Sequence, residues 1–240
     1  MTDMRLMAAT ALLLSLPGTA LAQARDCRVP AVLPRPAVDE ATAQQPRRNV
    51  PIGGYTLALT WSPEYCRTRA NSPTDRFQCG GGPARFGFTL HGLWPDGLGE
   101  QWPQYCRPAA LLPDRLVRSN LCMTPSVQLL QHEYAKHGTC MSASPEAYFR
   151  TAGALYGGLR FPDMAALSRR PTLSVRQLAE ALATSNPGTD AAMWKIATNR
   201  KGWLEEVRLC LDTALKPKRC RAWAGGAKPN DSVRIWRGGN

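Results

Sequence analysis

The spacing of hydrophobic residues predicts strands in the first half of the chain and again near its C-terminus. Apolar and polar residues alternate at 55–61, a segment rich in strand-forming residues. A second such segment lies at 86–95. Towards the C-terminus, the same criteria favour three further strands, at 192–198, 203–211 and 233–236.

Helical spacing of apolar residues appears in other segments. It favours a short helix within 111–121 and longer helices at 145–159 and 175–183. One more helix is indicated by its boundary residues, because Thr124 can cap its start, Pro125 suits its first position and Gly138 can close its end. Residues 71–85 contain a Gly-Gly-Gly-Pro run and are expected to form a loop.

These segments do not alternate regularly between strand and helix, and they contain no internal repeat. The order favours an α+β fold over a doubly wound sheet. We therefore expect a single domain at 51–240 with a central antiparallel sheet packed by several helices. Its length is sufficient for a sizeable core.

The two segments before this domain, 1–22 and 23–50, have other sequence patterns than the domain itself. Residues 1–22 combine Arg5, an apolar run at 6–16 and a final Ala-Leu-Ala, which is the pattern of a secretory signal peptide. Residues 23–50 are rich in Pro, Ala, Arg and Gln and predict an extended arm that Cys27 could tie down. No other apolar run reaches transmembrane length. We expect an exported protein, periplasmic or extracellular, without a membrane partner.

The chain has eight cysteines, all beyond residue 22, which fits disulfide formation in an oxidising compartment. Eight cysteines allow 105 pairings, so spacing alone does not select one. Cys66 with Cys79 and Cys210 with Cys220 would close short loops. No paired Cys-x-x-Cys zinc pattern is present.

Histidine is confined to two places in the chain. There are three histidines, and His132 and His137 stand in one short run with Glu133 and with Lys136, the first lysine of the sequence. On an α-helix these side chains lie within ~140° of one another. Such a set can transfer protons and stabilise a developing anion, as phosphoryl transfer without a metal requires. The alternative is a solvated helix face.

The third histidine, His91, begins a second cluster. Gly92 beside it allows close approach of a ligand, Trp94 offers a stacking surface for a base, and Asp96 can accept from an exocyclic amino group. The alternative is that His91 and Trp94 are core residues. A net charge of +12 favours a polyanionic substrate, although charge alone does not define one.

Residues 88–95 (FTLHGLWP) and 132–140 (HEYAKHGTC) resemble the two active-site segments of the T2 family of ribonucleases. The resemblance is clear over 51–140 and looser elsewhere. Tyr134 stands where the family commonly has tryptophan, and Leu129-Leu130 where it often has an aromatic pair. These departures concern packing around the helix.

The resemblance implies an endoribonuclease that cleaves single-stranded RNA through a 2′,3′-cyclic phosphate, without a metal or other cofactor. DNA lacks the 2′-hydroxyl and should not be cleaved. His137 resembles the base for the 2′-hydroxyl and His91 the acid for the leaving 5′-oxygen. Glu133 and Lys136 match groups that stabilise the phosphorane, and His132 matches a phosphate contact.

Further expectations follow from the same resemblance. Trp94 with Asp96 resembles part of a base-binding site. A disulfide between Cys106 and Cys140 is implied, and we expect a monomer.

Two other functions have some support in the sequence. A zinc peptidase is suggested by His132-Glu133, but the next histidine is five residues on, not four, and position 136 is a lysine. A secreted RNA-binding module without catalysis would be expected to lack one of the histidines, and none is missing.

Overall fold

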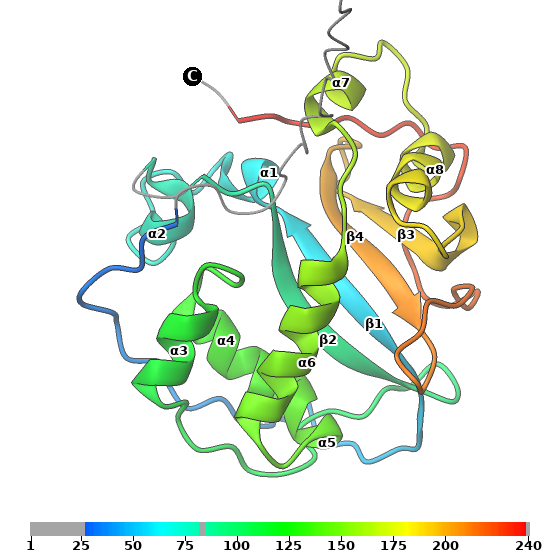
Figure 1. Ribbon diagram of the computed structural model, residues 1–240. Coiled ribbons are helices and arrows are strands. Elements are labelled where there is room, and N and C mark those ends of the chain that lie inside the picture. The colour runs from blue at the N-terminus through cyan, green and yellow to red at the C-terminus, as the bar shows by residue number, and fades with distance from the viewer. Residues whose placement is uncertain (1–26, 82–84, 239–240) are drawn as a thin grey trace, which may run out of the picture.

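The centre of the molecule is a four-stranded antiparallel sheet (Figure 1). The structure is a computed structural model that describes residues 27–81 and 85–238. Within these residues the strand order is β2-β1-β4-β3, and helices pack around the sheet. The expected α+β fold is confirmed. The strands are β1 (Ile52–Trp61), β2 (Phe88–Gly97), β3 (Trp194–Thr198) and β4 (Leu204–Leu211).

The helices agree with the sequence where apolar spacing was regular. The expected helices at 111–121, 145–159 and 175–183 are present as α3 (Asp114–Asn120), α6 (Pro145–Gly158) and α8 (Val175–Ser185). Short helices that we did not predict are α1 (Ser62–Cys66), α2 (Arg76–Cys79), α7 (Met164–Ser168) and the 3₁₀-helix η2 (Ala191–Met193). The remaining helical stretch runs through α4 (Val127–Glu133), the π-helix η1 (Tyr134–Gly138) and α5 (Thr139–Met141).

Two expectations about loops and strands are wrong. The segment 71–85 contains α2 and is not a loop throughout. The segment 233–236 is not a strand, because it forms only an isolated bridge between Trp203 and Arg234. Val233 and Ile235 are buried, so their alternation reflects packing on the core without a continuous ladder.

The two faces of the sheet have different roles. One face carries apolar side chains of every strand, among them Leu57 paired with Leu93 and Leu209. Helices α6 and α8 cover this face, as Figure 1 shows, and complete the core. The phenol of Tyr156 on α6 donates a 2.7 Å hydrogen bond to the carbonyl of Phe88. The opposite face of the sheet carries the polar residues described below.

Four disulfides connect the described part of the chain. Cys66–Cys79 and Cys210–Cys220 close short loops, as the spacing suggested. Cys106–Cys140 confirms the pairing implied by the family resemblance. Cys27–Cys122 joins the N-terminal segment to the turn after α3.

The N-terminal arm, residues 27–50, contains no helix and none of the four strands. It begins at the Cys27–Cys122 disulfide and leads into β1. The expected signal peptide, residues 1–22, lies outside the described residues. Among those that the structure describes, no helix is long and apolar enough to cross a membrane.

Candidate active site

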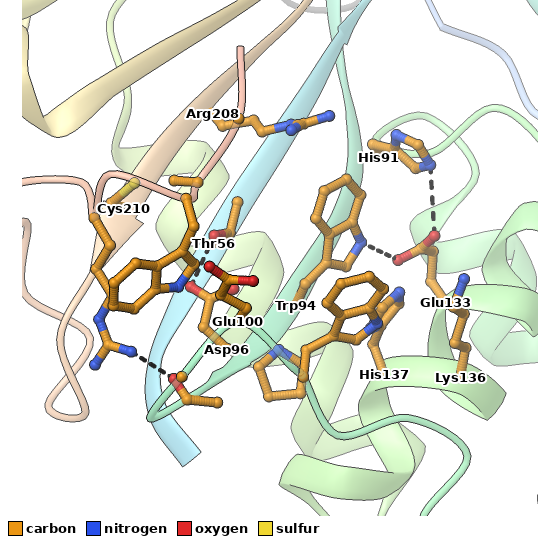
Figure 2. A pocket seen from close by; sticks show the side chains of 18 of the residues that line it. Thr56, His91, Trp94, Asp96, Glu100, Glu133, Lys136, His137, Arg208 and Cys210 are labelled. Carbon is orange, nitrogen blue, oxygen red and sulfur yellow. Dashed lines mark hydrogen bonds and ion pairs between the residues drawn. The ribbon is translucent and has the colours of Figure 1, made fainter. Parts of the chain in front are cut away.

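A pocket of about 460 Å³ lies where the polar face of the sheet meets the helix α4–η1 (Figure 2). Strand β2 supplies one wall, and the α4–η1 helix supplies another. The structure brings all seven residues predicted for the site to this pocket: His91, Trp94, Asp96, His132, Glu133, Lys136 and His137.

A β-bulge in β2 places His91 on this wall. Alternation puts side chains three residues apart on opposite faces of a strand. The register between β1 and β2 shifts between Ala58, which pairs with Gly92, and Leu59, which pairs with Leu90. His91 is therefore the extra residue of the bulge, and it joins Trp94 on the polar face. Their ring centroids are 5.0 Å apart.

Gly92 allows the helix to approach this bulge closely. A Cβ atom at position 92 would overlap the Oε2 atom of Glu133 and lie 2.6 Å from Nε1 of Trp94. In its place, the Trp94 indole donates a 2.8 Å hydrogen bond to Glu133 Oε2. This bond joins the wall from the sheet to the wall from the helix.

The helical stretch that carries His132 and His137 begins and ends at other residues than we expected. It is capped by Ser126, whose side chain accepts from the Leu129 amide, whereas Thr124 donates to the carbonyl of Leu90. Gly138 does not end the helix, which continues to Met141. A Cβ at Gly138 would crowd the ring of Tyr148 at 3.0 Å, so glycine serves close packing here and not a C-cap.

The π-helical turn η1 carries Lys136 and His137. A π-helix is wider than an α-helix, and such turns often occur at functional sites. The side-chain directions on this turn therefore depart from α-helical angles. His137 nevertheless faces the pocket, as does Lys136 (Figure 2).

His137 is held in an environment that disfavours its charged form. The side chain is buried, and its Nδ1 atom has no hydrogen-bond partner in the described part of the chain. Burial, the ammonium of Lys136 and the other two histidines together lower the pKa of His137 well below its usual value. At neutral pH His137 is therefore a neutral imidazole that can accept a proton.

His91 is held in the opposite way. Its Nδ1 atom donates a 2.5 Å hydrogen bond to Glu206 Oε2, and its Nε2 atom lies 3.6 Å from Glu133 Oε1. Burial lowers the pKa of His91, but the Glu206 hydrogen bond and the charges of Glu133 and Glu206 outweigh it, so that the pKa is raised. His91 is therefore suited to carry a proton.

Sequence reasoning did not identify Glu206. It lies on β4 with Arg208, whose Nε atom donates to Glu206 Oε1 at 2.6 Å. Burial raises the pKa of Glu206, but the bonds to His91 and Arg208 and their charges hold it below its usual value. Residues two apart in a strand lie on the same face, so the spacing of Glu206 and Arg208 in an expected strand is the pattern that could have indicated this pair.

Glu133 and Lys136 are two further charged residues on the α4–η1 side of the pocket. Glu133 is 2% exposed. Burial raises the pKa of Glu133, against the opposing effects of His91, His132 and the Trp94 hydrogen bond. The Lys136 ammonium makes no hydrogen bond or ion pair to other described residues and lines the pocket. The ammonium of Lys136 is thus available to a bound anion.

His132 reaches the pocket from the last turn of α4. Its Nδ1 atom donates to Asp39 Oδ2 at 3.0 Å, and the Tyr105 hydroxyl donates to Asp39 Oδ1 at 2.8 Å. This leaves Nε2 of His132 as the nitrogen available to a ligand. Asp39 was not identified from the sequence.

Trp94 and Asp96 form the aromatic and polar end of the pocket. Asp96 Oδ2 accepts a 2.9 Å hydrogen bond from Thr56 Oγ1. Burial raises the pKa of Asp96 despite this bond and the nearby Lys218, Arg221 and Arg208. Trp102 and Trp223, which sequence reasoning also missed, line the same end and are about half exposed.

A metal site is not formed by the described residues. Among residues 27–81 and 85–238, no group of three or more His, Cys, Asp or Glu could hold a metal ion. His132 and Glu133, which suggested a zinc peptidase, bind Asp39 and Trp94 instead of converging on one point.

The fold and site together define an α+β protein with a histidine, carboxylate and lysine cluster suited to proton transfer around an anion. The chain is 29% identical over 185 residues to a probable ribonuclease of Haemophilus influenzae, covering 72% of this chain and 62% of that protein. It is 39% identical over 101 residues to a ribonuclease of Aeromonas hydrophila, covering 42% of this chain and 43% of that protein. The alignments thus span less than two thirds of either relative.

The solved structure of trichomaglin, described as a novel S-like ribonuclease, matches with a TM-score of 0.60 at 22% identity, covering 76% of this chain and 97% of that one. A model of the ribonuclease T2 family matches residues 52–220. The chain belongs to the ribonuclease T2 family.

Proposed function

We propose that this protein is an endoribonuclease that cleaves single-stranded RNA through a 2′,3′-cyclic phosphate without a metal. The observation that carries this proposal is that His91, bound by Glu206, and His137, whose Nδ1 has no partner among the described residues, face one pocket with Lys136. These surroundings raise the pKa of His91 and lower that of His137. Environments that push the pKa values of two titratable groups apart separate a base from an acid. The sequence alone did not assign these roles, except through the family resemblance.

The proposed reaction uses RNA's own nucleophile. His137, neutral, takes the proton of the 2′-hydroxyl as its oxygen attacks phosphorus. His91, protonated, gives a proton to the 5′-oxygen as its bond to phosphorus breaks. Lys136 and Glu133 stabilise the phosphorane, and His132 contacts a phosphate oxygen through Nε2.

Substrate selection follows from the same pocket. A base can stack on Trp94 while Asp96 accepts from its exocyclic amino group. DNA lacks the 2′-hydroxyl and would not be cleaved. The net charge of +12 favours binding of a polyanion and makes binding weaker at high salt. We further propose a single domain at 51–240 and a protein that acts as a monomer after export, where its four disulfides are stable.

The proposal is tested by digestion of single-stranded RNA and dinucleotides with EDTA present. We expect cleavage to persist and to leave cyclic phosphate ends, whereas the matching DNA should stay intact.

His91→Phe or His137→Phe should each lower turnover by about 10² to 10⁴-fold, the usual contribution of one acid–base group. His132→Phe should cost less and act mainly on substrate binding.

Three results would contradict the proposal. Loss of activity in EDTA with recovery on adding a divalent ion would show that a metal is needed. RNA binding without cleavage would favour a binding module. If His132→Phe were the most damaging of the three substitutions, the roles assigned to the histidines would be wrong.

A further inference from the structure

The N-terminal arm places a side chain against His132, one of the residues that line the pocket. The family match begins at residue 52, beyond the arm. Asp39 nevertheless binds His132, 93 residues further along the chain. The side chains of Asp39 and His132 are only 18% and 29% exposed, so that this contact is partly shielded from solvent.

The arm is fixed on both sides of Asp39. On one side are the Cys27–Cys122 disulfide and two hydrogen bonds from Arg118 to the carbonyls of Pro30 and Ala31, at 2.9 and 2.8 Å. On the other, the backbones of Arg48 and Gln104 exchange two 2.9 Å hydrogen bonds. The arm is therefore anchored at sites distant from Asp39 itself.

A second set of contacts sets the position of Asp39. The Gln128 amide, one turn before His132 on α4, accepts from the Ala37 amide at 2.7 Å and donates to its carbonyl at 3.3 Å. The Tyr105 hydroxyl holds the Asp39 oxygen that does not face His132. Each carboxylate oxygen thus has one partner, and the carboxylate cannot rotate freely.

We propose that Asp39 is a positioning residue that fixes the ring of His132 for phosphate binding. A carboxylate at Nδ1 fixes the orientation of the ring and so directs Nε2 to the pocket, where a proton on Nε2 would donate to a phosphate oxygen. The arm then belongs to the active site of this protein, although it lies outside the family domain. This inference rests on the proposed RNA cleavage, which gives His132 its phosphate contact.

The test is Asp39→Asn in the full mature chain, with Glu40→Gln as matched control. Glu40 is the next residue of the arm, is exposed and makes no hydrogen bond or ion pair within the described residues. With an RNA dinucleotide in EDTA, Asp39→Asn should raise KM roughly tenfold, the scale of one hydrogen bond to a charged group, and change kcat much less. Glu40→Gln should leave both constants unchanged.

A second substitution shows whether Asp39 acts through His132. In a His132→Gln background, Asp39→Asn should have no further effect on KM, because its partner is gone. A purely structural role of Asp39 would instead lower activity in both backgrounds. Equal KM values for Asp39→Asn and Glu40→Gln, or an undiminished effect in the His132→Gln background, would overturn the inference.

A spectroscopic measurement separates this inference from the proposed function. The chain has three histidines, so that ¹⁵N spectra of the imidazoles can be assigned by substitution. We expect His132 to show a protonated Nδ1 that Asp39→Asn alters and Glu40→Gln does not. If wild-type protein fails to cleave RNA, the proposed function fails, while this spectrum still tests the Asp39–His132 pair.

Discussion

At the scale of single residues, the carboxylate of Glu206 separates the proposed roles of His91 and His137 as acid and base. His91 contacts this carboxylate in addition to that of Glu133. Glu206 holds Nδ1 of His91 at 2.5 Å, and Arg208 holds Glu206. No comparable carboxylate binds Nδ1 of His137, which has no hydrogen-bond partner among the described residues. The difference between proposed acid and proposed base therefore depends on a residue of β4, outside both histidine segments.

We expect Glu206→Gln to move the alkaline limb of the pH profile to lower pH. His91 must be protonated to act as an acid, and its raised pKa extends activity above the usual histidine value of about 6.5. Activity is lost as pH rises through the pKa of His91 in the folded protein. Glutamine keeps an acceptor for Nδ1 but removes the charge, so that this pKa should fall. The measurement is kcat/KM as a function of pH.

The acid limb provides an internal control for this experiment. It reports deprotonation of His137, whose lowered pKa places the limb below the usual histidine range, and Glu206→Gln should leave it in place. Glu180→Gln, which removes an exposed charge on α8, should move neither limb. An unchanged alkaline limb in Glu206→Gln would show that Glu206 does not act through His91.

The sequence predicted site residues that lie in short, unusual motifs. It did not predict the residues far along the chain that bind them. His91, His132 and His137 could be predicted because the chain has no other histidine, and Glu133 because it lies between two of them. Glu206 and Asp39 are 115 and 93 residues from the histidines they bind. Their roles depend on strand register and on the path of the arm, which no local pattern records.

At the scale of secondary structure elements, two irregularities form the site. The bulge in β2 brings His91 to the face of Trp94, and the π-helical turn presents Lys136 and His137. Counting by twos along 86–95 would have placed His91 and Trp94 on opposite faces. Periodic patterns predicted the strands and helices well and could not predict a break in periodicity.

Gly92→Ala should disable the site while leaving the fold intact. The added methyl group would overlap Glu133 Oε2 and press on the Trp94 indole, so that the carboxylate and its hydrogen bond to the indole must shift. A shift of about 1 Å at a catalytic group can lower the rate by about 10²-fold. We expect a loss of that order in kcat, measured on RNA, with an unchanged circular dichroism spectrum.

Gly157→Ala is the matched control for this substitution. Gly157 lies in α6, and a Cβ there would have nothing within 4 Å. Alanine should leave activity unchanged and stabilise the protein by up to about 1 kcal/mol, since glycine is a poor helix former. Wild-type activity in Gly92→Ala would show that the close approach of helix and bulge is not required.

At the scale of the whole molecule, disulfides connect the site to segments outside the sheet. Cys106–Cys140 links α5, the end of the helical stretch that carries His137, to the loop after β2, and Tyr105, next to Cys106, donates its amide to the carbonyl of Lys136 at 2.7 Å. Cys27–Cys122 holds the arm that carries Asp39. Spacing could not select these two pairings, because each joins segments distant in sequence.

Replacing Cys106 and Cys140 together by alanine should lower both stability and kcat. Loss of a native disulfide typically costs about 2–5 kcal/mol in the free energy of unfolding. Because this bond also positions His137 relative to His91, kcat should fall at temperatures where the variant is still fully folded. Denaturant unfolding and turnover of an RNA dinucleotide measure the two effects.

The Cys66–Cys79 pair offers the comparison. It closes a local loop between α1 and α2 and has no link to the α4–η1 helix. Replacing both of its cysteines by alanine should lower stability and leave kcat of the folded protein unchanged. Equal losses of kcat in the two double variants would show that the Cys106–Cys140 bond contributes stability alone.

The disulfides also affect whether the protein could cleave the RNA of the cell that makes it. Thiols stay reduced in the cytosol, where a cell keeps its own RNA. In a protein that is exported and cleaves RNA, as we propose, a chain still in the cytosol would lack the bonds that fix the α4–η1 helix and the arm and would be a poor catalyst there. Oxidation after export would then switch on the proposed activity, so that disulfide formation itself keeps this activity away from the host's transcripts.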